Sequence, residues 1–232
     1  MATARQLAHP VPEEAYRLRM SYEQFLQWAE EDAHAEWVDG EVIVFMPPKD
    51  RHQKIVQFLI ALLSNYVDTF GLGEIRPAPF EMRLSPSGPS REPDILFIAT
   101  ENLHRLTEER VEGAADVVIE VVSQDSLRRD RHQKFAEYQS FGVREYWLVD
   151  SQTSEGSVEA FVLNEQGVYE PIPLEEGVIR SRVIPGFWLK VEWLGKETMP
   201  KPLIAFAQIV GLPQETLDAL RSSAERKRTR EG

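Results

Sequence analysis

The stretch Val117-Val118-Ile119-Glu120-Val121-Val122 is β-branched and apolar apart from one glutamate. Such a run is typical of a strand that is covered on both faces of a sheet. An unpaired carboxylate inside that strand would be costly, so Glu120 is expected to have a cationic partner or to bind a metal ion. This strand is therefore central both to the fold and to the search for a site.

Helices and strands alternate on either side of this strand. An unbroken i, i+3, i+4 pattern of apolar residues predicts a long helix that Gly71 ends. The expected elements, in order, are a helix over 52–70, strands over 75–84, 94–98 and 116–122, a helix over 127–141 and a strand over 145–150. This αβββαβ order indicates a layered α/β domain with a mixed central sheet.

Further elements are expected at both ends of this core. Residues 1–19 are polar and contain two prolines, which favours a flexible N-terminal arm. Ser21 and Gln24 match a capping box that opens a helix to about residue 35, and Asp39-Gly40 predicts a hairpin after it. Antiparallel strands added to the sheet are expected over 157–194, and a helix over about 202–227. The expected division is thus an arm over 1–19, one domain over 20–195 and a helical extension over 196–232.

Composition narrows the class of protein. The chain has 232 residues and is 42% hydrophobic, which suits one globular domain with a sizeable core. It contains no cysteine, which excludes disulfides, thiolate metal sites and a cysteine nucleophile. No apolar run approaches the roughly 20 residues that span a bilayer, and residues 1–14 lack the apolar stretch of a signal peptide. A cytoplasmic location is therefore expected.

The net charge of −12 bears on nucleic-acid binding. A protein that binds DNA tightly and without sequence preference through charge is expected to be basic. The acidic balance argues against that class. It argues less against a metal-dependent nuclease, in which bound cations offset the local carboxylates.

Asp94 is the second carboxylate whose position suggests chemistry. It follows Pro93 at the start of an expected strand, and it can converge with Glu120 at one end of the sheet if the two strands are neighbours. Such hard oxygen ligands favour Mg²⁺ or Mn²⁺. A metal there could activate a water molecule and neutralise charge on a phosphodiester. Lys134, on the following helix, could contact the scissile phosphate as a point charge.

These stretches together resemble the Uma-type restriction endonuclease-like family, a group within the PD-(D/E)xK nuclease superfamily. The resemblance covers about residues 20–195. It is carried by Pro93-Asp94, by Ile119-Glu120-Val121-Val122-Ser123, by Asp130, Lys134 and Tyr138, by Gly142-Val143, by Glu145-Tyr146-Trp147-Leu148-Val149-Asp150, by Glu36 with Asp39-Gly40, by His52 and by Pro185-Gly186-Phe187.

The resemblance implies a restriction endonuclease-like αβββαβ core, with metal ligation by Asp94 and Glu120. In the wider superfamily the lysine lies two residues after the glutamate, and here that position is Val122. The resemblance implies that the lysine has moved to Lys134. DNA is the implied substrate, and a homodimer is expected because proteins of this superfamily are often dimers.

Weaker candidates surround these residues. Glu36 could act as an additional metal ligand and catalytic residue. His52 falls on the apolar stripe of its helix, so it is expected to face the sheet, where it could ligate a metal, contact phosphate or orient water. Ser123 could help to position the phosphate or Glu120.

Structural alternatives remain open at each position. Asp94 could simply cap a loop, and Glu120 could form a buried ion pair with Lys134 or an arginine. Lys134 could instead make a surface salt bridge with Asp130. At the level of function, Val122 and the net charge favour a nuclease fold without catalysis that acts as a binding or regulatory module. An RNA hydrolase or another phosphodiesterase on the same scaffold is the other alternative.

Overall fold

A mixed six-stranded sheet carries the core in a computed structural model that describes residues 14–29, 35–45, 49–122, 133–219 and 222. Its strands, in spatial order, are β12 (Tyr169–Pro171), β11 (Val158–Leu163), β10 (Glu145–Asp150), β9 (Val117–Val122), β7 (Ile95–Ala99) and β4 (Gly73–Pro77). Strands β9 and β10 run parallel, and the other neighbours are antiparallel. The expected mixed sheet and αβββαβ order are confirmed.

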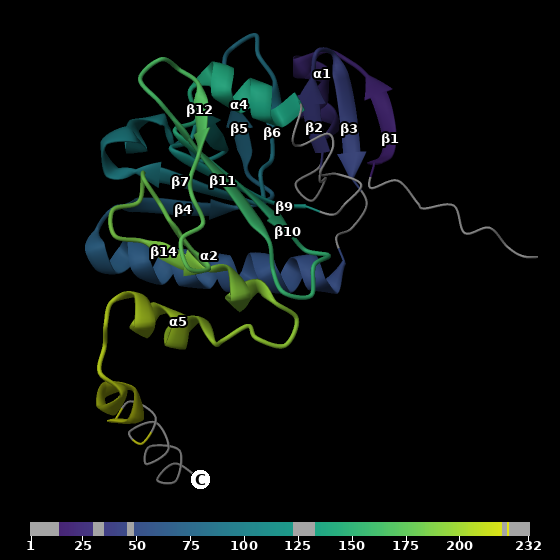
Figure 1. Cartoon of the computed structure of the whole chain (residues 1–232). Coiled ribbons are helices and arrows are strands. Elements are labelled where there is room, and N and C mark those ends of the chain that lie inside the picture. The colour runs from purple at the N-terminus through teal and green to yellow at the C-terminus, as the bar shows by residue number, and fades with distance from the viewer. Residues whose placement is uncertain (1–13, 30–34, 46–48, 123–132, 220–221, 223–232) are drawn as a thin grey trace, which may run out of the picture.

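Helices cover both faces of this sheet. Helix α2 (Asp50–Phe70) lies on one face and the short helix α4 (Phe135–Phe141) on the other, as Figure 1 shows. Alternate residues of β9 join two separate apolar clusters, with Ile119 on the α2 side and Val118 on the α4 side. The expectation that this strand is covered on both faces is confirmed, and all six of its residues are buried.

The predicted long helix is confirmed as α2, whose apolar stripe packs on the sheet. Ile55, Leu59 and Leu62 are fully buried in the larger cluster. Burying each such side chain contributes about 1.5–3 kcal/mol. The helix ends at Gly71, which adopts the left-handed conformation that glycine favours.

A second six-stranded sheet stands beside the first. Its strands, in spatial order, are β1 (Glu14–Arg19), β3 (Glu41–Phe45), β2 (Ala35–Val38), β6 (Ser90–Arg91), β5 (Glu81–Arg83) and β8 (Arg110–Glu112). The hairpin predicted at Asp39-Gly40 joins β2 and β3, and both turn residues have positive φ angles. Strand β2 carries Glu36 and strand β6 carries Arg91. Their side chains contact Lys134 and Glu137 at helix α4.

The N-terminal expectations are correct in part. Strand β1 pairs with β3, so residues 14–19 belong to a sheet and not to the expected arm. The capping box of Ser21 and Gln24 is confirmed, and α1 (Tyr22–Trp28) begins there. The helix does not continue to residue 35, because Ala35 already starts β2 and pairs with Val44.

Two other sequence predictions need correction. The single strand expected over 75–84 is two strands in different sheets, β4 and β5, separated at Ala78-Pro79. Proline has no N–H to donate to a ladder, which fits an interruption there. Of the strands expected over 157–194, β11 and β12 extend the first sheet, whereas β13 (Val178–Arg180) and β14 (Trp188–Lys190) form a separate pair.

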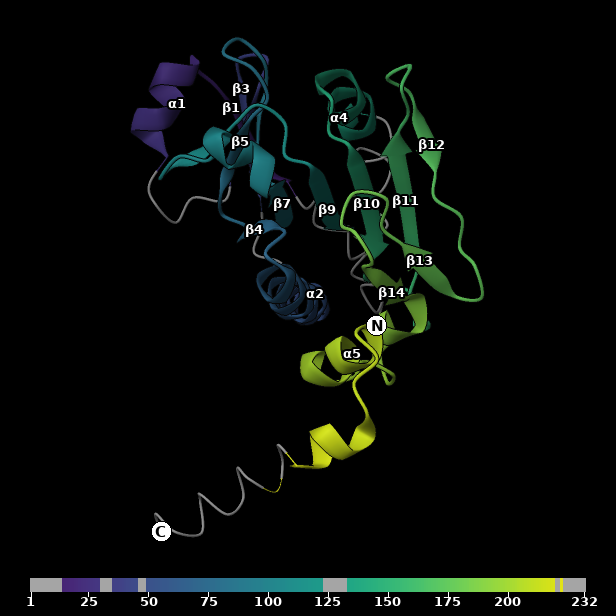
Figure 2. The ribbon, with the colours of Figure 1, turned by 90° about the vertical axis from the view of Figure 1, so that its left-hand side faces the viewer.

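Short helical elements complete the described chain. Two 3-10 helices, η1 (Thr100–Arg105) and η3 (Val191–Leu194), follow strands β7 and β14. Helix α5 (Pro202–Ile209) packs against α2 on the side away from the sheet, as Figure 2 shows. The helix expected over 202–227 is interrupted at Gly211, after which residues 214–219 are helical. The first part of the helix expected over 127–141 lies outside the described residues. None of the helices in the described part of the chain is long and apolar enough to span a membrane.

Candidate active site

Lys134 is buried between two glutamates. Its Nζ donates to Glu120 Oε1 at 2.8 Å and lies 3.0 Å from Glu36 Oε1. The Tyr138 hydroxyl donates to the same Glu120 oxygen at 2.9 Å. The ion pair between Glu120 and Lys134, one of the alternatives left open by the sequence, is therefore present. Because a carboxylate has two oxygens with several acceptor positions, this pairing and metal ligation can coexist.

Arg91 connects this cluster to its surroundings. It is fully buried, and its Nη1 donates to Glu36 Oε2 at 2.8 Å. Its Nε and Nη2 form a two-point contact with the Glu137 carboxylate at 2.9 and 2.7 Å. Sequence reasoning missed both Arg91 and Glu137. The only available signal was that Glu137 lies three residues after Lys134 and so shares its helix face.

Electrostatics keeps Glu36 and Arg91 ionised. Burial would raise the pKa of Glu36, but the positive charges of Lys134 and Arg91 outweigh burial and lower that pKa to about 2. Burial opposes the charge of Arg91, yet Glu36, Tyr138 and Glu137 hold its pKa above the usual value. The pKa of Tyr138 is raised first by burial and then by Glu120 and Glu36, so its hydroxyl remains a neutral donor.

Asp94 lies beside β9, the strand that carries Glu120, and contacts His52. Strands β7 and β9 pair with Ile95 opposite Ile119, which brings Asp94 next to β9 at the level of Glu120. Its Oδ2 accepts the Val121 N–H at 2.7 Å and lies 3.3 Å from His52 Nε2. His52, in the first turn of α2, thus faces the sheet as expected. Within the described part of the chain, the other oxygen of Asp94, Oδ1, accepts no hydrogen bond.

The chemistry of the donors fits a site for a divalent cation. Both candidate ligands, Asp94 and Glu120, offer the hard oxygens that Mg²⁺ and Mn²⁺ prefer.

Glu36 is arranged differently from the other two candidate ligands. Among the residues that the structure describes, no three Asp, Glu or His side chains form a ready cluster for a metal ion. Glu36 is instead held by Lys134 and Arg91. A site with two carboxylates is still consistent with Mg²⁺, which usually keeps several waters and takes other ligands from substrate phosphates. Ser123 and Asp130, two further candidates, lie outside the described residues.

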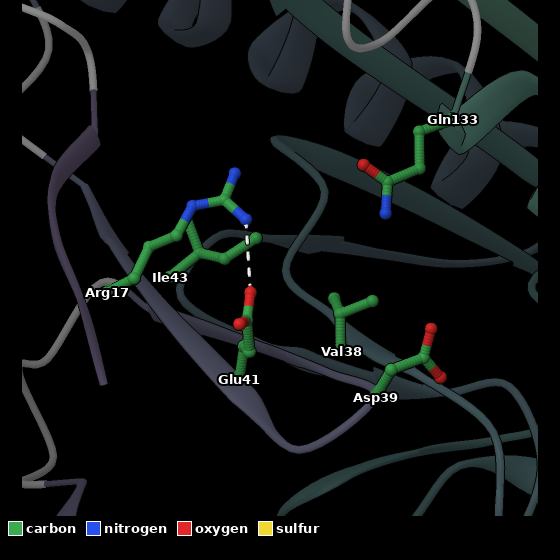
Figure 3. A pocket seen from close by; sticks show the side chains of 6 residues that line it. All are labelled: Arg17, Val38, Asp39, Glu41, Ile43 and Gln133. Atoms are coloured by element: carbon green, nitrogen blue, oxygen red, sulfur yellow. Dashed lines mark hydrogen bonds and ion pairs between the residues drawn. The ribbon is translucent and has the colours of Figure 1, made fainter. Parts of the chain in front are cut away.

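A hollow of about 290 Å³ lies between the β2–β3 hairpin and Gln133, the residue that directly precedes Lys134, as Figure 3 shows. Arg17 and Glu41 form an ion pair at 3.2 Å on its wall. Its lining residues are Arg17, Val38, Asp39, Glu41, Ile43 and Gln133.

Comparisons with known proteins bear on the family and the fold. The model of the Uma2 family, described as "Putative restriction endonuclease", matches residues 22–192. The chain belongs to the Uma2 family. The matched range agrees with the expected one of about 20–195, and it contains Glu36, His52, Asp94, Glu120 and Lys134. The resemblance noted in the sequence is thereby confirmed.

A solved structure supports the fold of this Uma2 chain. It is the crystal structure of "a putative nuclease belonging to DUF820" from Anabaena variabilis ATCC 29413. The TM-score is 0.58 at 18% sequence identity, over 74% of this chain and 95% of that chain. This likeness confirms the restriction endonuclease-like fold. No curated protein matches the chain.

Proposed function

We propose that the protein is an endonuclease that hydrolyses DNA phosphodiester bonds with Mg²⁺ or Mn²⁺. The observation that carries the proposal is Lys134, a buried ammonium group held between Glu36 of β2 and Glu120 of β9. Strand β9 also contacts Asp94, through the Val121 N–H. A buried lysine that is paired with two carboxylates points to a role beyond stability. Replacing buried ion pairs by apolar residues is often neutral or stabilising, so stability alone does not call for such a pair. The family and fold support a nuclease in general.

Each residue has a distinct role in this proposal. Asp94 and Glu120 would hold the cation, which when bound lowers the pKa of a water ligand and offsets charge on the phosphate. Lys134 would place a point charge against the scissile phosphate and the attacking water. His52, held against Asp94, would contact phosphate or orient water. Glu36 would fix the ammonium group of Lys134, and it would reach the cation only if that contact shifts.

Plasmid cleavage tests the proposal. Supercoiled DNA is incubated with the full chain and Mg²⁺ or Mn²⁺, and nicked and linear products are measured over time. Asp94→Asn removes one charge with little change in shape, and we expect it to reduce the rate by about 100-fold or more, beyond the 10–100-fold loss typical of groups that only surround metal ligands. Asp68→Asn, an exposed site near the far end of α2, is the matched control.

The outcomes separate the alternative functions. Equal cleavage by the wild type and Asp94→Asn contradicts the assignment of Asp94. Cleavage of RNA or of small phosphodiesters, but not of DNA, assigns the site to another substrate. Folded wild-type protein that cleaves none of these substrates supports a nuclease fold acting as a binding or regulatory module. A homodimer, which would present two sites to the two DNA strands, is tested by light scattering with and without DNA.

A further inference from the structure

Arg91 is placed to control the geometry of the site without touching a substrate. The pairing of Trp37 with Ser90 puts Glu36 and Arg91 side by side on neighbouring strands of the second sheet. The Arg91 side chain then reaches α4, the helix that covers one face of the first sheet, where it contacts Glu137. It therefore links the two sheets at the level of Lys134.

The contacts of Arg91 form one continuous chain to the site lysine. Arg91 donates to Glu36 Oε2, and Glu36 presents its other oxygen, Oε1, to Lys134 Nζ at 3.0 Å. On the opposite side, Arg91 holds Glu137 of α4, the helix whose N-cap residue is Lys134. Both routes from Arg91 thus end at the lysine, one through a carboxylate and one through the helix that follows it.

The guanidinium group is suited to this task and an ammonium group is not. A guanidinium has five donors in a rigid planar fork, so it can engage one carboxylate at two points while it bonds a second. A lysine at this position would carry the same charge on a flexible stem, but it lacks the planar fork that engages Glu137 at two points while it bonds Glu36. The Arg91 side chain is also wholly buried, so its charge has to be compensated by these two carboxylates.

We propose that Arg91 is a positioning residue that orients Glu36 and α4 so that Lys134 points its ammonium group into the active site. The kinetic part of this proposal rests on the proposed nuclease function. The structural part, that Arg91 fixes Lys134, does not.

The test compares two buried arginines changed in the same way. Arg91→Lys removes the fork and keeps the charge. Arg83→Lys is the matched control, because Arg83 is also buried on the second sheet but contacts the Gly88 carbonyl and the Tyr22 ring. Circular dichroism and urea denaturation confirm that each variant is folded. Glu137→Gln is a milder second variant, because it keeps Arg91 and its bond to Glu36.

The first readout needs no catalysis. In protein labelled with ¹⁵N at the lysine Nζ, the Lys134 ammonium should give a signal protected from solvent exchange, assigned by its loss in Lys134→Arg. We expect this signal to broaden or vanish in Arg91→Lys, to weaken in Glu137→Gln and to persist in Arg83→Lys. A signal unchanged in Arg91→Lys, or absent from the wild type, overturns the proposal.

The second readout is the rate of plasmid cleavage at saturating Mn²⁺. We expect kcat to fall about 10–100-fold in Arg91→Lys, the range typical of residues that orient a metal site, and KM for DNA to change less than about threefold. An Arg91→Lys variant as fast as Arg83→Lys contradicts the proposal. If the wild type cleaves nothing, the proposed nuclease function fails, and the lysine signal alone decides the role of Arg91.

Discussion

Removing the charge of Glu36 should change how stability depends on pH. In the folded protein the pKa of this buried carboxyl is about 2, against an ordinary value of 4.5. A carboxyl with a lowered pKa stabilises the fold fully above its unfolded pKa, and this contribution is lost as the pH falls through the folded pKa. Since each pH unit corresponds to about 1.4 kcal/mol, Glu36 contributes roughly 3 kcal/mol at neutral pH. That contribution should disappear between about pH 4.5 and pH 2.

Urea denaturation between pH 6 and pH 2 measures this contribution directly. The free energy of unfolding of Glu36→Gln, which cannot titrate, is subtracted from that of the wild type at each pH. We expect the difference to shrink by roughly 3 kcal/mol as the pH falls to 2. Glu165→Gln, at an exposed turn position, reports the effect of removing a surface carboxylate. A constant difference between the wild type and Glu36→Gln across this range would refute the reasoning.

Three further changes test other parts of the structure. Tyr138→Phe removes a buried donor to Glu120 and should lower the free energy of unfolding in urea by about 1–3 kcal/mol; an unchanged value would show that this bond adds nothing. Lys134→Met leaves two buried carboxylates without their shared cation and should cost about 3–5 kcal/mol in the same assay at pH 7, whereas a neutral or stabilising effect would contradict the charged network. Gly73→Ala should lower thermal stability by about 2 kcal/mol or more, because its Cβ would lie 2.0 Å from the Ile98 carbonyl oxygen at a φ of +150°; a melting temperature equal to that of the wild type would be evidence against this close approach.

Local sequence signals predicted the elements that depend on few residues. The stripe on α2, the Asp39-Gly40 turn and the apolar strand β9 each follow from periodicity or turn chemistry within the segment itself. Predictions failed where tertiary pairing decides. The run 75–84 has strand composition throughout, yet its two halves pair with different sheets. Residues 14–19 become a strand only because β3 offers an edge to pair with.

The same distinction holds for the site. Glu120, Asp94 and Lys134 could be named as candidates because a carboxylate in an apolar strand, an Asp after proline and a lysine on the next helix follow a known order. Arg91 could not, because its burial requires partners 55 and 46 residues away in the sequence. The position of Lys134 between two glutamates likewise depends on Glu36, which a separate sheet supplies.

Anomalous diffraction from a crystal of the full chain soaked in Mn²⁺ tests the central claim most directly. We predict a peak of anomalous density between the carboxylates of Asp94 and Glu120, with the ammonium group of Lys134 directed towards it. Density only at other positions, or none at a Mn²⁺ concentration that supports DNA cleavage, would contradict the assignment of these two residues as metal ligands.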